Sequence, residues 1–193
     1  MSSTVLYMSM SLDGFITGPD DHHGQGLGVG GERLHDWLAQ GRPGFRPEGD
    51  SAKVFDEMMS TGAVVVGRRT FEMAGEWGGD HHGVPLFVLT RELPDEQKRN
   101  RYPQVTYVTD IETAAARAKE AAGDKDVLVH GARLTELALK AGVLDELEIH
   151  QIPVLLGEGR RLFDNFGTEH IELELVWAIE ALGVIYLRYR VVK

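Results

Sequence analysis

Short runs of β-branched and aliphatic residues that lead into helix-like segments recur along this chain of 193 residues. The clearest are 63–67 (AVVVG), 84–90 (VPLFVLT) and 126–131 (DVLVHG). Apolar runs this short, alternating with helical patterns, are typical of strands that are buried on both faces of a parallel sheet. The pattern therefore predicts an α/β fold in three layers, with a mostly parallel central sheet and helices on both faces.

Other segments complete this predicted sheet. Further strands are expected at 4–10, 15–17, 104–109 and 144–156, and helices at 32–41, 51–62, 68–77, 110–123 and 132–142. Segment 171–192 alternates apolar and polar residues and breaks at Gly183, which predicts an antiparallel hairpin at the sheet edge. We expect a single domain over residues 1–193, with the hairpin pairing across a homodimer.

Composition excludes several classes of function. A formal net charge of −10 argues against a general nucleic-acid surface, and the absence of cysteine excludes disulfides and thiolate metal sites. No apolar stretch reaches the roughly 18 residues that a membrane span needs, and the first residues lack the basic region of a signal peptide. We therefore expect a cytoplasmic protein that acts on a small molecule.

Two arginines stand where a helix would not favour them. Arg68 and Arg69 follow Gly67 and precede Thr70 at the start of a predicted helix, facing the positive end of its dipole. A strand that leads through glycine into a helix binds anions through its free N–H groups, so a phosphate there would explain both arginines. The alternative is that the arginines are solvated or paired with nearby acidic residues.

Two other strand ends carry compatible residues. Gly131, Ala132 and Arg133 repeat the turn after one strand, and Thr90 and Arg91 follow another. Small residues admit a phosphate close to the backbone, while a loop arginine favours NADP over NAD. Together the three strand ends predict a ligand with several phosphates, lying across the carboxyl ends of the strands.

Two further motifs are not interpreted as ligand-binding sites. Residues 26–31 match G-x-G-x-x-G, but they follow a polar segment rather than a strand, so we expect a mobile loop that covers the substrate. The pairs His22–His23 and His81–His82 lack further ligands at a regular spacing, so solvated loop residues are favoured over a metal site.

Four segments in order resemble the dihydrofolate reductase fold. They are 8–20 (MSMSLDGFITGPD), 64–72 (VVVGRRTFE), 127–134 (VLVHGARL) and 153–163 (PVLLGEGRRLF). More closely, they resemble the reductase domain of bacterial riboflavin biosynthesis and its free-standing relatives, over essentially the whole chain. The chain differs in having Phe15 after SLDG, where riboflavin-pathway reductases often have a lysine or arginine. Leu34 stands where folate-type reductases carry a carboxylate.

The resemblance implies NADPH as the cofactor. By matching motif, Gly67, Arg68, Arg69 and Thr70 would hold phosphates, and Thr90 and Arg91 would contact the adenosine ribose phosphate. Gly131, Ala132 and Arg133 would border the pyrophosphate, and Leu155, Gly157 and Gly159 would lie near the ligand cleft.

The implied reaction is hydride transfer from the nicotinamide to a C=N or C=O group of a small pteridine- or pyrimidine-like heterocycle. Asp13 and Asp36 are the candidate proton donors or substrate anchors, and burial would raise their pKa values. As alternatives, Asp13 forms a turn and Asp36 faces solvent. A non-catalytic NADP(H)-binding protein and a structural homodimer with a vestigial cleft are the competing functions.

Overall fold

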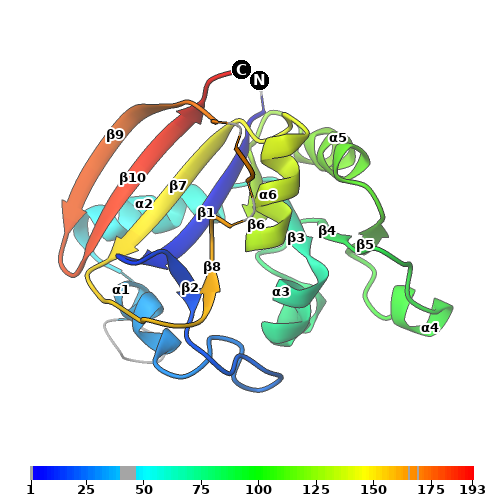
Figure 1. Cartoon of the computed structure of the whole chain (residues 1–193). Helices are drawn as coiled ribbons and strands as arrows, with labels where there is room; N and C mark the ends of the chain where they lie inside the picture. Colours follow the sequence, from blue (N-terminus) through cyan, green and yellow to red (C-terminus); the bar gives the residue numbers. More distant parts are fainter. Residues whose placement is uncertain (1, 40–46, 165, 169) are drawn as a thin grey trace.

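An eight-stranded sheet forms the centre of the computed structural model (Figure 1), which describes residues 2–39, 47–164, 166–168 and 170–193. In spatial order, the strands are β5 (Val105–Val108), β4 (Leu86–Leu89), β3 (Ala63–Gly67), β6 (Val127–His130), β1 (Thr4–Ser11), β7 (Glu146–Ile152), β10 (Val184–Val191) and β9 (Leu173–Ala181). The first six run parallel, and β10 and β9 form an antiparallel pair at one edge. The α/β class and the edge hairpin predicted from the sequence are confirmed.

Each face of the sheet has its own apolar core, because side chains alternate along the strands. Val65 of β3 packs on the face that α5 (Ile111–Ala122) and α6 (Ala132–Lys140) cover. Val64 and Val66 pack on the opposite face, with α2 (Gly49–Met59) and α3 (Arg68–Met73). All three valines are at most 1% exposed, and each burial contributes roughly 1.5–3 kcal/mol. Covered faces on both sides explain why the run AVVVG has no polar position.

Short elements gather at the carboxyl ends of the parallel strands, in the lower part of Figure 1. They are β2 (Phe15–Thr17), which pairs with β8 (Arg160–Arg161), the 3₁₀ helices η1 (Gly31–His35) and η2 (Gly75–Gly79), and α1 (Asp36–Ala39). The chain termini lie at the other end of the sheet, where Asp145 accepts hydrogen bonds from Thr4 N (2.9 Å) and Lys193 Nζ (2.6 Å).

Two predicted helices differ from the structure. The helix expected over 68–77 ends at Met73, because Gly75 (φ 67°), Glu76 (φ 56°) and Trp77 (φ 45°) adopt left-handed backbone that an α-helix cannot continue. The helix expected over 32–41 is divided into η1 and α1, and its expected end at Gly41 lies outside the described residues. A short helix, α4 (Glu96–Arg99), was not predicted; the Asp95 side chain caps it by accepting from Lys98 N at 2.8 Å.

Candidate functional site

A cleft of about 1590 Å³ lies at the carboxyl ends of the central strands. Strands β4, β3 and β6 are neighbours in the sheet, so the turns that follow them open onto the same space. Nine of the predicted site residues line this cleft: Gly67, Arg68, Arg69, Thr70, Thr90, Arg91, Gly131, Ala132 and Arg133. We call this part of the cleft the basic lobe.

The turns after β3 and β6 touch each other. Gly131 has φ +114°, and a Cβ atom built there would lie 2.6 Å from Thr70 Oγ1. Such a distance is shorter than real Cβ contacts allow, so any larger residue at 131 would force the Thr70 side chain, in the first turn of α3, to shift. Glycine therefore allows the two strand–helix turns to lie side by side in the basic lobe, which leaves room for an anion at the backbone.

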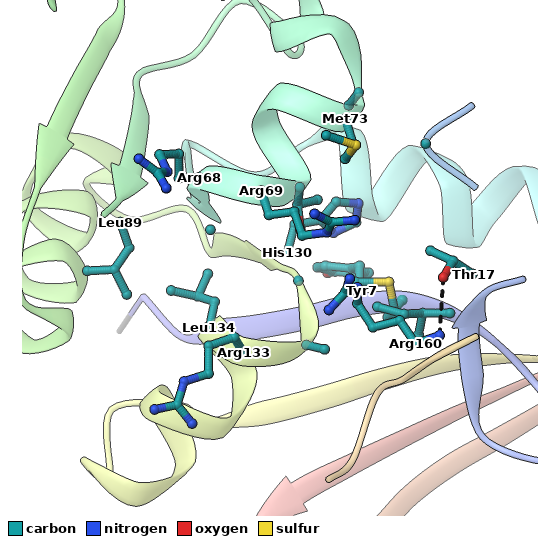
Figure 2. Close-up of a pocket in the computed structure, with 18 of the residues that line it drawn as sticks. Tyr7, Thr17, Arg68, Arg69, Met73, Leu89, His130, Arg133, Leu134 and Arg160 are labelled. Atoms are coloured by element: carbon teal, nitrogen blue, oxygen red, sulfur yellow. Dashed lines mark hydrogen bonds between the residues drawn. The ribbon is translucent and has the colours of Figure 1, made fainter. Parts of the chain in front are cut away.

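The arginines around the cleft, of which Figure 2 shows Arg68, Arg69 and Arg133, differ in whether they have an acidic partner. Arg69 Nη2 lies 2.9 Å from Asp21 Oδ2, and Arg133 Nη1 lies 2.5 Å from Glu136 Oε2, so the alternative of acidic partners is correct for these two. Arg68 and Arg91 are exposed, and neither forms an ion pair within the described part of the chain. The basic lobe thus offers two uncompensated guanidinium groups to an anionic ligand.

The glycine-rich segment 26–31 forms part of a closed loop rather than a strand–helix turn. Gly18 N donates to Leu27 O and Val29 N to Pro19 O, both at 2.8 Å. Asp21 in the same loop accepts from Arg69 and from Arg160 Nη2, the latter at 3.3 Å. The loop is therefore joined by ion pairs to α3 and β8, and its G-x-G-x-x-G pattern is not a dinucleotide-binding turn.

The structure places neither predicted carboxylate in the lining of the cleft. Asp13 accepts from Ser11 Oγ (2.5 Å), Gly157 N (2.7 Å) and Leu156 N (3.2 Å). These bonds, above all that from Ser11, lower the pKa of Asp13 to about 2, so the expected rise in its pKa is wrong. Asp36 forms an ion pair with Arg33 on a separate hollow, and its side chain is 43% exposed.

The segment after β7 contains the three residues that were expected near the cleft. Leu155 is 70% exposed, and Leu155, Gly157 and Gly159 are absent from the cleft lining. Within this segment, only Arg160 lines the cleft, and its backbone N donates to Thr17 Oγ1 at 3.2 Å (Figure 2). Asp13 and Thr17 therefore hold the segment against β2, and Arg160 reaches the ligand space.

The sequence reasoning missed a second part of the cleft, over the sheet face that α2 covers. We call it the aromatic lobe, and it is lined by Tyr7, His35, Trp37, Trp77, His130 and His150. Burial lowers the pKa of His130 to about 3, and burial together with His82 lowers that of nearby His81 to about 4. Burial, then the neighbouring His150, also lowers the pKa of His35. These three imidazoles are therefore neutral near neutral pH.

Trp37 and Phe15, two aromatic residues near the first strand, have different positions relative to the cleft. Trp37 lines the aromatic lobe and is also part of the core, with 6% exposure and its Nε1 donating to Ser9 Oγ at 2.9 Å. Phe15 is 5% exposed under the guanidinium of Arg161, at 4.4 Å, and is absent from the cleft lining. A titratable residue at the end of an otherwise apolar strand, as His130 is in β6, is the signal that would have revealed this lobe.

A buried network of charged side chains contacts two residues of the aromatic lobe, His150 and Tyr7. Glu148 of β7 is fully buried and lies between Arg188 Nη1 (2.6 Å) and His150 Nε2 (3.0 Å). Arg188 also donates to Glu146 Oε2 (2.6 Å) and to the hydroxyl of Tyr7 (3.2 Å). Burial raises the pKa of the Tyr7 hydroxyl, which stays protonated. The network fixes the His150 ring by its Nε2 atom.

Metal-binding and membrane-spanning features are absent from the described residues. They contain no group of three or more histidine or acidic side chains arranged to hold a metal ion. Within the same ranges, no helix combines the length and apolar character needed to cross a bilayer.

Comparisons with known proteins agree with this architecture. The family model of the RibD C-terminal domain matches residues 3–183. The uncharacterized protein YwjB of Bacillus subtilis (strain 168) is 30% identical over 178 residues, which are 86% of this chain and 85% of that protein. Among solved structures, a putative riboflavin biosynthesis protein from Shewanella sp. PV-4 matches with TM-score 0.73 and 20% identity, covering 99% of both chains. Dihydrofolate reductase from Enterococcus faecalis, complexed with NADP(H), matches with TM-score 0.60 and 18% identity over 99% of this chain and 97% of that one.

Proposed function

Because the chain belongs to the RibD C-terminal domain family, we propose that it is an NADPH-dependent reductase of a small, pteridine- or pyrimidine-like heterocycle. One observation carries the proposal: the turns after β3, β4 and β6 meet in one basic lobe, where Arg68 and Arg91 have no acidic partner among the described residues. A ligand with several phosphates would supply the missing negative charge.

The residues of the basic lobe suit such a cofactor. Close packing of Gly131 on Thr70 leaves the backbone of both turns within reach of a pyrophosphate. Arg91, at the end of β4, would bind the ribose phosphate that distinguishes NADPH from NADH. When bound, the cofactor supplies the hydride, and the protein's part is to orient the two ligands and to exclude water.

A titration of the protein with NADPH and with NADH tests the proposal. Trp37 and Trp77 line the cleft, so tryptophan emission reports binding directly. We expect NADPH to bind more tightly than NADH. The Arg91→Ala variant should lose about 10–100-fold in NADPH affinity and keep its NADH affinity, because a charge-assisted bond to phosphate is removed.

The matched control is Arg190→Ala, which removes an exposed arginine paired with Glu174 on the antiparallel edge of the sheet, away from the cleft. It should leave both affinities unchanged. Failure of wild-type protein to bind either nucleotide contradicts the proposal, and an unchanged NADPH preference in Arg91→Ala contradicts the role given to Arg91.

A non-catalytic NADP(H)-binding protein is the second candidate. It is favoured by one observation, that neither Asp13 nor Asp36 lines the cleft. An assay of NADPH absorbance, run at high enzyme concentration with each of a panel of pteridines and pyrimidinediones, separates the two functions. Oxidation with any ring supports the reductase, and tight NADPH binding without oxidation across the panel supports the binding protein.

A further inference from the structure

Unsatisfied polar atoms concentrate at the aromatic lobe. Within the described residues, three buried side-chain nitrogen or oxygen atoms have no hydrogen-bond partner: Ser2 Oγ, His130 Nδ1 and His150 Nδ1. Both histidines line the cleft. A buried polar atom left without a partner destabilises a fold by about 1–3 kcal/mol, so its retention in the wall of a cleft points to a ligand that supplies the partner.

The contact with Glu148 indicates which nitrogen of the His150 ring carries a hydrogen. Its side chain is 2% exposed, and its Nε2 lies 3.0 Å from Glu148 Oε1. Glu148 also receives the Arg188 guanidinium, so the carboxylate acts as acceptor on both sides and Nε2 carries the hydrogen. In the neutral form of this ring, the other nitrogen, Nδ1, has a free lone pair and acts as an acceptor.

Neighbouring rings hold His150 in place. Trp37 packs edge-on against it at 4.6 Å between ring centroids, and Tyr186 does so at 5.1 Å. The Tyr186 hydroxyl donates to Ser51 Oγ at 2.7 Å, and Trp37 Nε1 donates to Ser9 Oγ at 2.9 Å. Both polar groups of these neighbours are therefore already engaged with other residues, which leaves Nδ1 of His150 for a ligand.

The charged side chains around the aromatic lobe already have partners among the described residues. The lowered pKa values of His35, His81 and His130 keep these rings neutral. Arg188 is 4% exposed and is paired with Glu57, Glu146 and Glu148, and Arg160 and Arg69 share Asp21. Among the described residues, the polar atoms of this lobe that lack a partner are thus the Nδ1 atoms of His130 and His150.

We propose that the aromatic lobe binds a planar heterocycle, and that His150 Nδ1 anchors the ring by accepting a hydrogen bond from a ring N–H group. The inference rests on the proposed function in one respect, since this ring is taken to be the hydride acceptor. His150 is assigned as a substrate-binding residue.

A matched pair of probes tests the anchor without any variant. Lumazine is an uncharged two-ring pteridine with N–H donors on its dione ring, and 1,3-dimethyllumazine replaces both donors with methyl groups. Binding of each is measured by calorimetry in the absence of nucleotide. We expect lumazine to bind about tenfold more tightly, since one hydrogen bond is worth roughly 1 kcal/mol or somewhat more. Equal binding of the two probes, or no binding of lumazine, overturns the proposal.

Two substitutions at one position separate hydrogen bonding from packing. His150→Asn keeps a polar group at the position of Nδ1, while His150→Leu keeps the volume and removes the acceptor. His150→Asn should retain lumazine affinity within about threefold, and His150→Leu should lose about tenfold and no longer distinguish the two probes. Equal lumazine affinities in the two variants, or wild-type affinity in His150→Leu, contradict the anchor.

NADPH titration of the same variants keeps the two proposals apart. His150 lies outside the basic lobe, so both variants should bind NADPH like the wild type. If lumazine binding follows the expected pattern and NADPH does not bind, the cofactor proposal fails and the anchor stands. If NADPH binds and the probes do not, the anchor fails and the cofactor proposal stands.

Discussion

At the scale of single residues, Asp13 shows how a plausible catalytic side chain can be a structural one. Its sequence neighbours, Leu12 and Gly14, suggest an acid at the end of a strand. The structure instead gives it three donors, two of them backbone N–H groups of Leu156 and Gly157, more than 140 positions away. Contacts between residues so far apart in the chain cannot be predicted from the local sequence. The ionised carboxylate holds the segment before β8 in place.

The pH dependence of stability tests this role. The pKa of Asp13 falls from its usual value near 3.8 to about 2 in the folded chain, so its contribution to stability is fully present above pH 3.8 and is lost as the pH falls to about 2. Asp13→Asn should lower the melting temperature at neutral pH, by a margin that shrinks toward pH 2, and leave NADPH affinity unchanged. Asp36→Asn, at an exposed ion pair, is the control. A loss of NADPH affinity in Asp13→Asn would contradict the structural role.

At the scale of elements, the strand–helix turns were predictable and the surrounding short helices were not. A buried strand, its glycine and its arginines occupy adjacent positions in the sequence, so 63–71 and 127–134 reveal both the turn and its chemistry. The end of α3 has a local signal in Gly75, which adopts left-handed backbone (φ 67°). The left-handed backbone that continues through Glu76 and Trp77 has no such signal, because these residue types rarely adopt it. The aromatic lobe was missed for a related reason, because His35, His130 and His150 come from three separate elements.

The contact between the turns after β3 and β6 gives a prediction at this scale. Gly131→Ala places a Cβ atom 2.6 Å from Thr70 Oγ1 at a residue with φ +114°. We expect the variant to lose roughly 1–3 kcal/mol of unfolding free energy in urea and to bind NADPH more weakly, because residue 131 is strained at this φ and the Thr70 side chain, which lines the basic lobe, must shift.

Gly142→Ala is the matched control for backbone strain alone, since Gly142 has φ +67° and a Cβ atom added there would have no other atom within 4 Å. Adding Thr70→Ala to Gly131→Ala should recover part of the loss. Equal effects of the two glycine substitutions would show that the contact with Thr70 is unimportant.

At the scale of the whole molecule, the antiparallel edge stays exposed. Leu173, Leu175, Val176 and Ile185 on β9 and β10 are 41–55% exposed, an unusual density of apolar side chains on one hairpin. The sequence alternation already suggested pairing across a homodimer, and we keep this as a proposal. The sequence of one chain predicts the strands of its own sheet, but it does not predict whether a second copy of the chain covers the sheet edge.

Light scattering after size-exclusion chromatography tests the homodimer. We expect the mass of a dimer for the wild type and of a monomer for Leu175→Glu, because a buried charge without a partner is strongly unfavourable in an apolar interface. Leu93→Glu alters a leucine of similar exposure, 50%, in the loop after β4 and should remain a dimer. A monomeric wild type would contradict the proposal.

The position of the chain ends has a practical consequence for protein engineering. Asp145 bonds to both Thr4 and Lys193, at the end of the sheet opposite the short elements that surround the cleft (Figure 1). A reporter domain fused to either end, or a surface to which either end is tethered, would therefore leave the ligand entrance open. A short linker that joins the two ends would also permit circular permutation, with new termini in the exposed turn at residues 123–125 between α5 and β6, away from the cleft.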